Sequence, residues 1–159
     1  MATYPFPIPD SVAQGLTGAS IGKGTAREVF AVPSDPDVVI KKLRGVFPGS
    51  NMVEWYIWNW VQTTPLANRF GKCLTISETA QYLFMERLNN LDTLDYADIP
   101  QMPIWLDDRK PDAFGKVNGV IKVRDYGLLK WDKLLSQTVA PLQIQLDAMN
   151  KRIAQVPGY

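Results

Sequence analysis

Residues 17–43 hold three short segments of strand character separated by turn residues, and this pattern limits the fold more than any other part of the chain. The segments cover about 17–22, 27–32 and 37–43, with breaks at Gly22-Lys23-Gly24 and at the Pro33 to Pro36 cluster. Clusters of glycine and proline end regular structure, and runs of this length with β-branched residues are typical of strands. The sequence therefore predicts three consecutive strands joined by short turns.

The next segment, "GSNMVEWYIWNWVQTT", has helical rather than strand periodicity. Met52, Tyr56 and Trp60 recur every four residues, and neighbouring apolar residues widen the same face. Ser50 or Asn51 is expected to be the N-cap. These features predict a helix over about 51–63, which Pro65 ends.

Two further strands are expected after this helix, in "CLTISET" and "QYLFMERL". They complete five strands around one helix, so the predicted fold class is α+β. Residues 89–104 have little periodicity and are expected to be mostly loop, and Asn118-Gly119 between two apolar arms predicts a β-hairpin. The tail predicts two short amphipathic helices, marked by Leu128, Trp131 and Leu135, and then by Leu142, Leu146, Met149 and Ile153.

Three prolines among residues 5–9 predict an extended N-terminal arm over 1–16 that contributes little to the core, with one helical turn over Ser11 to Leu16. The remaining residues, 17–159, are expected to form a single domain, because the length of 159 residues and the apolar content of 46% suit one compact core. Within it, 17–88 forms a small lobe and 89–159 a reduced second lobe.

Composition excludes several classes of function. The net charge of +1 gives no field that favours nucleic acid or an anionic membrane, so neither is expected as a partner. The chain has no histidine and one cysteine, Cys73, which excludes histidine-activated nucleophiles, an internal disulfide and a thiolate zinc cage. No stretch reaches the ~18 apolar residues of a membrane span, and we expect a cytoplasmic protein.

Five features that carry chemistry follow one another along the chain, and each also has a purely structural explanation. Gly22 and Gly24 leave room for backbone amides to approach phosphate, or simply form a turn. Lys41 ends the strand "VVIK" and is either a phosphate ligand or an edge-strand lysine. Glu54 is the one acid on a very apolar helix, and it is either a solvated residue or the partner of a buried lysine.

The last two features are the loop "LDDRKPDAFG" and the segment "VIKVRDYGL". Each places a carboxylate in a loop between strands, where it could hold a metal ion over phosphates. The carboxylates are Asp108 and Asp125, and Asp125 has the alternative role of an Asx-turn residue.

In this order the five features resemble the motifs of protein kinases, over roughly residues 17–135. Gly22, Gly24 and Val29 match the glycine-rich loop, in which Arg27 replaces the third glycine and either obstructs or contacts the phosphates. The resemblance implies a kinase-like small lobe, with a five-stranded antiparallel sheet plus one helix, and a minimal, truncated C-lobe.

The resemblance also implies roles for residues around ATP and Mg²⁺. Lys41 would bind the α- and β-phosphates with Glu54 as its ion-pair partner, Met85 would be the gatekeeper, and the backbone of Glu86 and Leu88 would face adenine. Asp108 would be the catalytic base, Lys110 would neutralise the transferred phosphoryl group, and Asp125 would bind the metal.

Three departures from the kinase pattern weaken catalysis. Ala113 stands where the family has a metal-binding asparagine, although Asp107 or Asp112 could substitute. Only 19 residues separate Leu88 from Asp108, too few for the usual long helix. After Gly127 only 32 residues remain, without an Ala-Pro-Glu motif, so the segment that aligns an acceptor hydroxyl is missing or minimal.

The expected function is therefore that of a degenerate kinase-like protein with a residual nucleotide cleft, which acts mainly by binding a host protein. Compact proteins of this kind resemble those that phages and mobile elements carry. One alternative is an active minimal phosphotransferase that uses Mg-ATP, and another is an α+β adaptor unrelated to kinases. Trp55, Trp58 and Trp60 crowd the predicted helix, either as core or as a surface that a partner covers.

Overall fold

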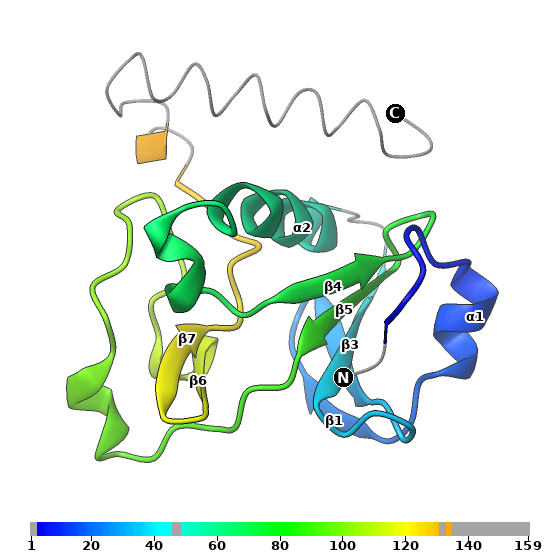
Figure 1. The fold of residues 1–159 in the computed structure, drawn as a ribbon, viewed down its shortest axis with the longest axis horizontal. Helices are drawn as coiled ribbons and strands as arrows, with labels where there is room; N and C mark the ends of the chain where they lie inside the picture. The colour runs from blue at the N-terminus through cyan, green and yellow to red at the C-terminus, as the bar shows by residue number, and fades with distance from the viewer. Residues whose placement is uncertain (1–2, 46–48, 131–132, 135–159) are drawn as a thin grey trace.

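The computed structural model describes residues 3–45, 49–130 and 133–134, and it confirms the predicted α+β class (Figure 1). Its centre is a five-stranded antiparallel sheet with strand order β1-β2-β3-β5-β4. The strands are β1 (Ser20–Lys23), β2 (Arg27–Ala31), β3 (Val38–Leu43), β4 (Cys73–Ile76) and β5 (Tyr82–Glu86). All five strands lie within or close to the ranges that the sequence predicts.

The helix α2 (Gly49–Val61) packs against one face of this sheet, mainly over β4. Its start differs from the prediction: because the helix begins at Gly49, Asn51 lies in its first turn and is not the N-cap. The Asn51 side chain is fully buried, and its Nδ2 donates to the carbonyl oxygens of Lys41, Ala80 and Gln81 at 3.2, 2.9 and 3.1 Å. Asn51 therefore fixes the helix start to the sheet.

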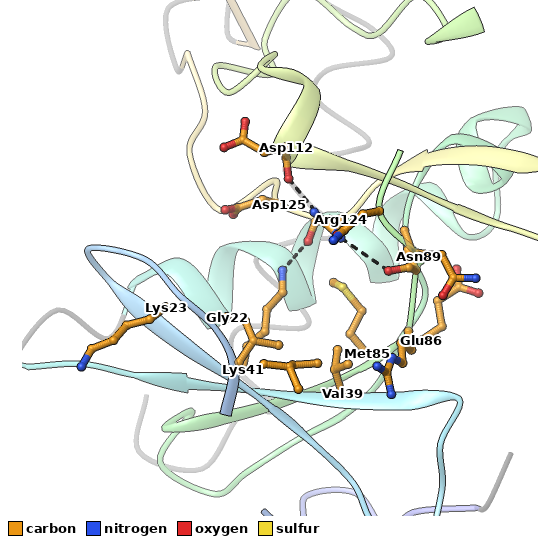
Figure 2. A pocket seen from close by; sticks show the side chains of 15 residues that line it. Gly22, Lys23, Val39, Lys41, Met85, Glu86, Asn89, Asp112, Arg124 and Asp125 are labelled. Carbon is orange, nitrogen blue, oxygen red and sulfur yellow. Dashed lines mark hydrogen bonds between the residues drawn. The ribbon is translucent and has the colours of Figure 1, made fainter. Parts of the chain in front are cut away.

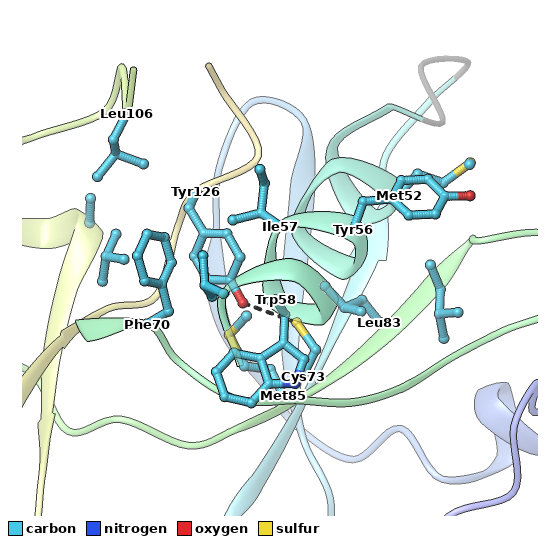
Figure 3. Close-up of a cluster of buried hydrophobic side chains, with 14 of the residues drawn as sticks. Met52, Tyr56, Ile57, Trp58, Phe70, Cys73, Leu83, Met85, Leu106 and Tyr126 are labelled. Atoms are coloured by element: carbon cyan, nitrogen blue, oxygen red, sulfur yellow. Dashed lines mark hydrogen bonds between the residues drawn. The ribbon is translucent and has the colours of Figure 1, made fainter. Parts of the chain in front are cut away.

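The main core lies between α2, the sheet and the residues that follow β7 (Figure 3). Phe70 and Tyr126 are fully buried and meet edge to face, with ring centroids 5.1 Å apart. The Tyr126 hydroxyl lies 3.1 Å from Cys73 Sγ and donates to the carbonyl of Gly71 at 2.7 Å. The ring packing and the hydrogen bonds of Tyr126 fix its position against the core, and with it the position of the neighbouring Asp125.

The tryptophans of α2 largely pack against the chain itself. Trp58 is 8% exposed, Trp55 stacks on Phe6 with centroids 5.2 Å apart, and Trp60 lies 5.5 Å from Trp105. These contacts within the described part of the chain favour core packing over a surface that a partner covers.

The N-terminal arm is part of the core, so the expectation that it contributes little is wrong. Ile8 has no exposed surface and packs in a second cluster with Ile40 and Phe84 on the other face of the sheet. Its amide donates to the carbonyl of Ile76 at 3.1 Å and its carbonyl accepts from Glu78 at 3.1 Å, as an added strand would. A short helix, α1 (Asp10–Gly15), follows it as predicted.

A separate hairpin, β6 (Phe114–Val117) and β7 (Val120–Val123), forms at the predicted Asn118-Gly119 turn. Asn118 and Gly119 have φ values of 48° and 77°, the left-handed pair that a two-residue type I′ turn requires. The hairpin is bonded to the rest of the chain through the bridges Asn89↔Lys116 and Phe70↔Val123.

Three 3₁₀ helices complete the described chain: η1 (Pro65–Arg69), η2 (Asp95–Asp98) and η3 (Pro111–Ala113). Residues 89–104 are otherwise loop, as predicted. The first helix predicted for the tail is wrong at its start, because residues 128–130 are not helical and Leu129 forms a β-bridge with Leu106. Of its remainder only Lys133 and Leu134 are described, and the second predicted helix lies outside the described residues. Among the described residues, no helix has the length and apolar character that a bilayer span needs.

Candidate nucleotide site

A cavity of about 370 Å³ lies between the sheet and the residues around β7 (Figure 2). On the sheet side, the lining comes from β1, β2, β3, β5 and the segment just after β5. It includes Gly22, Val29, Lys41, Met85, Glu86 and Leu88. From the opposite side, Asp112, Arg124 and Asp125 face the same space. The cavity therefore brings together residues more than a hundred positions apart in the sequence.

Lys41 and Glu54 form a buried ion pair at the back of this cavity. The Lys41 Nζ lies 2.8 Å from Oε2 and 3.1 Å from Oε1 of Glu54, and it also donates to the carbonyl of Arg124. Lys41 is 6% exposed and Glu54 is fully buried. Glu54 is therefore the partner of a buried lysine and not a solvated residue.

Arg27 is the second cation on the Glu54 carboxylate. Its Nη2 donates to Oε1 at 2.9 Å, and its Nη1 lies 2.8 Å from Oε2 as an ion pair. The same Nη2 donates to Oδ1 of Asp125. Arg27 is 8% exposed, because it points inward from β2 beneath the glycine turn. A guanidinium thus joins the helix carboxylate to the carboxylate that follows β7.

These contacts hold Glu54 in its ionised form. Complete burial opposes the charge, but Arg27 and Lys41 outweigh that effect and lower the pKa of Glu54 from 4.5 to about 2. The amide of Tyr126 also donates to Oε1 at 2.8 Å. Two positive and two negative side chains therefore form one neutral group, of which three members are buried and Asp125 is half-exposed: Arg27, Lys41, Glu54 and Asp125.

The end of the cavity farthest from this group is formed by the segment after β5. The Glu86 side chain is engaged elsewhere, because Oε1 accepts from the Lys72 amide at 2.8 Å and from Lys122 Nζ at 2.6 Å. Arg124 donates through Nη1 to the carbonyl of Leu88 at 3.4 Å and to Asn90 Oδ1 at 2.8 Å. The amide and carbonyl of Asn89 are bonded to Lys116, and Met85 lines the cavity beside this segment.

The fold itself does not require Gly22 or Gly24 to lack a side chain. A Cβ at Gly22 would meet Val29 at 3.7 Å, and one at Gly24 would meet the Arg27 carbonyl at 3.7 Å, both ordinary contacts. Gly22 pairs with Val29, and both line the cavity, so a side chain at Gly22 would occupy cavity space.

Asp108 and Lys110 do not line this cavity. They lie with Asp107, Arg109 and Leu128 on a second, more open depression of about 410 Å³. The Asp108 carboxylate accepts from the amide of Lys110 at 3.3 Å, a local turn contact. The structure thus groups Lys41, Glu54 and Asp125 around one cavity and places the two loop residues at another.

Ala113 is 3% exposed and packs in the core beside Phe114. Its carbonyl accepts from the amides of Arg124 and Asp125 at 2.8 and 3.2 Å, which fixes the start of the segment that carries Asp125. The backbone of Ala113 therefore shapes the site even though its side chain cannot bind a ligand.

The residues at the cavity do not fit a divalent metal ion. Mg²⁺ needs several oxygen ligands in octahedral geometry, whereas Oδ1 of Asp125 already accepts from Arg27 and Ala113 offers no side-chain ligand. Within residues 3–45, 49–130 and 133–134, no three acidic, cysteine or histidine side chains are grouped closely enough to hold a metal ion.

Sequence reasoning missed Arg124, and it singled out Arg27 without identifying its partners. Arg124 binds the segment after β5, and Arg27 binds Asp125, 98 positions away. The signal for Arg27 was that arginine stands where the loop pattern has its third glycine. This signal did not show which acid the side chain contacts. For Arg124 the sequence contains no comparable signal.

A scan against protein-family models finds no match for this chain, and neither does a search of the curated proteins. The case for its function therefore rests on the geometry of the cavity.

Proposed function

We propose that the chain is a kinase-like protein that binds an adenine nucleotide in the 370 Å³ cavity and acts through a host protein partner, without efficient phosphoryl transfer. Its small lobe would be the five-stranded sheet with α2, and its C-lobe the reduced part that follows β5.

One observation carries the nucleotide proposal. The residues that the resemblance assigns to nucleotide binding lie far apart in the sequence, yet most of them line one cavity. Lys41 pairs with Glu54 at the back of this cavity, where a lysine amine would reach phosphate oxygens. Glu86 and Leu88, whose backbone the resemblance assigns to the adenine base, line the other end.

A second observation argues against efficient transfer. Transfer needs a base and an acceptor hydroxyl aligned with the γ-phosphate. Asp108 and Lys110 line a different depression, Ala113 supplies no ligand, and Asp125 is held by Arg27. A protein that binds nucleotide without transferring its phosphate has to act through what it contacts, which is why the proposal includes a protein partner.

The direct test is the affinity for ATP, ADP and adenosine by isothermal titration calorimetry, with melting temperature as a second readout. A ligand that binds only the folded state adds about 2.7 kcal/mol of stability at a hundred times its Kd. For a domain of this size that is a rise of about 5–11 °C. No heat of binding and no rise with any of the three compounds would contradict the proposal.

Gly22→Val separates binding from folding. A valine suits a strand, and its side chain would project into the cavity, so we expect at least a tenfold loss of ATP affinity with a melting temperature within about 2 °C of the parent. Gly15→Val is the matched control, because a Cβ at Gly15 meets nothing within 4 Å and the residue lies at the end of α1.

Labelled ATP distinguishes this proposal from the active phosphotransferase. We expect no labelled protein when the chain is incubated with a host lysate and ATP. Labelling that Asp108→Asn abolishes would show that transfer survives and would favour the active phosphotransferase instead.

A further inference from the structure

Arg27 occupies the place next to Asp125 where a kinase-like site would need a cation. Its guanidinium carries one positive charge, is 8% exposed and donates to Oδ1 of Asp125 while it also holds both oxygens of Glu54. An arginine fixed by three such contacts is always charged and does not exchange with solvent ions. Asp125 therefore has a permanent counter-ion supplied by β2.

The charges around Arg27 are already balanced without a metal ion. Arg27 and Lys41 neutralise Glu54 and Asp125, and the Lys41 Nζ lies 2.8 Å from the carboxylate that Arg27 shares. A divalent ion at Asp125 would stand beside two buried cations and would have to break the Arg27 contact. Asp125 is half-exposed, so the effective dielectric constant there lies between those of the interior and of water, and the repulsion is stronger than in bulk water.

The cavity nevertheless offers positive charge to an anionic ligand. Lys41 and Arg124 line it from opposite sides, and Lys23 lies at its edge with the side chain pointing outward (Figure 2). The carboxylate that would repel a phosphate, Asp125, is half-exposed but paired with Arg27. A polyphosphate can therefore approach without the divalent ion that normally shields it from an aspartate.

We propose that Arg27 is a built-in substitute for the metal ion, so that the cavity binds a nucleoside polyphosphate as the free anion and excludes divalent cations from Asp125. This inference rests on the proposed function for the identity of the ligand. The exclusion of the metal is a property of the protein alone and can be measured without nucleotide.

The first experiment is calorimetric titration of the intact chain with ATP, in EDTA and in excess Mg²⁺. We expect the two dissociation constants to agree within about twofold. An affinity that Mg²⁺ raises tenfold or more would overturn the inference, and no binding in either buffer would contradict the proposed function and leave the decision to the metal measurement.

The second experiment removes the guanidinium in Arg27→Met, which keeps the length of the side chain, and in Arg27→Gly, which restores the glycine of the kinase pattern. We expect ATP binding by either variant to become at least tenfold stronger in Mg²⁺ than in EDTA. Arg69→Ala is the control, because Arg69 is exposed on η1 and contacts the carbonyl of Gln101. Equal affinities in the two buffers for both folded variants would overturn the inference.

The third experiment uses Mn²⁺ alone and follows its electron paramagnetic resonance signal, so that no nucleotide is needed. We expect the parent chain to bind no Mn²⁺ at 1 mM, on the order of the weakest protein sites, and Arg27→Met to bind one ion that a further Asp125→Asn change removes. Binding by the parent that Asp125→Asn abolishes would overturn the inference even if both Arg27 variants fail to fold.

Discussion

The Glu54 carboxylate has no exposed surface and accepts from Arg27, Lys41 and the amide of Tyr126. Removing one partner of such a buried pair leaves an uncompensated charge and is expected to cost about 3–5 kcal/mol. At the scale of single residues, this one acid therefore determines whether β2, β3, α2 and the segment after β7 stay together.

Protonation of Glu54 should destabilise the fold at low pH. Its pKa is about 2 in the folded chain and 4.5 ordinarily, so the stabilisation is complete above pH 4.5 and is lost as the pH falls toward 2. The shift corresponds to roughly 3 kcal/mol. Urea denaturation between pH 6 and pH 2.5 measures it.

The control is Glu78→Gln, which changes the same type of side chain at an exposed position and should keep the acid sensitivity of the parent. Glu54→Gln should lower stability at pH 6 and flatten the pH dependence. A parent chain with equal stability at pH 6 and pH 3 would refute the role given to Glu54.

Ala113→Asn should destabilise the protein and should not restore phosphoryl transfer. Ala113 is 3% exposed, so an asparagine would bury an amide with no partner provided, at a cost of about 1–3 kcal/mol. Ala97→Asn, at an exposed position in η2, is the control and should leave stability unchanged. Denaturation and labelled-ATP assays measure both effects, and a gain of transfer would contradict this account.

Among the elements, the β6–β7 hairpin packs against the segment after β5, which lines the cavity. Gly115 in β6 lies so close to the segment after β5 that a Cβ would come within 2.5 Å of Leu88 Cβ and 2.9 Å of the Asn89 carbonyl oxygen. No side chain fits there unless the backbone moves. The close approach lets the hairpin pair with Asn89 through two hydrogen bonds of 2.9 and 2.8 Å with Lys116.

Gly115→Ala should therefore destabilise the chain by about 1–3 kcal/mol, as overpacking does, and should weaken ATP binding because the segment after β5 shifts. Gly15→Ala is the control, since a Cβ there meets nothing within 4 Å. Chemical denaturation and calorimetry measure the two effects. A variant as stable as the parent would show that the hairpin is not closely packed in this way.

The elements themselves could be predicted from the sequence, because the strands after Gly18 and the helix after Gly49 are marked by periodicity and by glycine and proline. The site could be predicted only in part. The pairing of Lys41 with Glu54 could be predicted, because the sequence shows a lysine on an apolar strand and one acid on an apolar helix. The partner of Arg27 could not, because Asp125 lies 98 positions away in the sequence. Asp108 lines a different depression, and no periodicity in its loop indicates which way the side chain points.

On the scale of the whole molecule, the N-terminal residues are an integral part of the fold. The prolines around Ile8 correctly indicate extended backbone, but not that this backbone adds to the sheet through the amide and carbonyl of Ile8. Ile8→Ala should lower stability by about 2–5 kcal/mol, since the side chain is fully buried. Val12→Ala, at a residue that is 47% exposed, is the control, and equal losses would contradict this role.

The two backbone bridges of the β6–β7 hairpin limit how the cavity can open. The hairpin is attached both at Phe70–Gly71 and at Asn89, so the two walls of the cavity cannot swing apart about a single pivot. Every residue of β1, by contrast, is exposed, and this strand is paired on one side only. For the proposed nucleotide, we therefore expect the exchange rate to follow the fraying of β1.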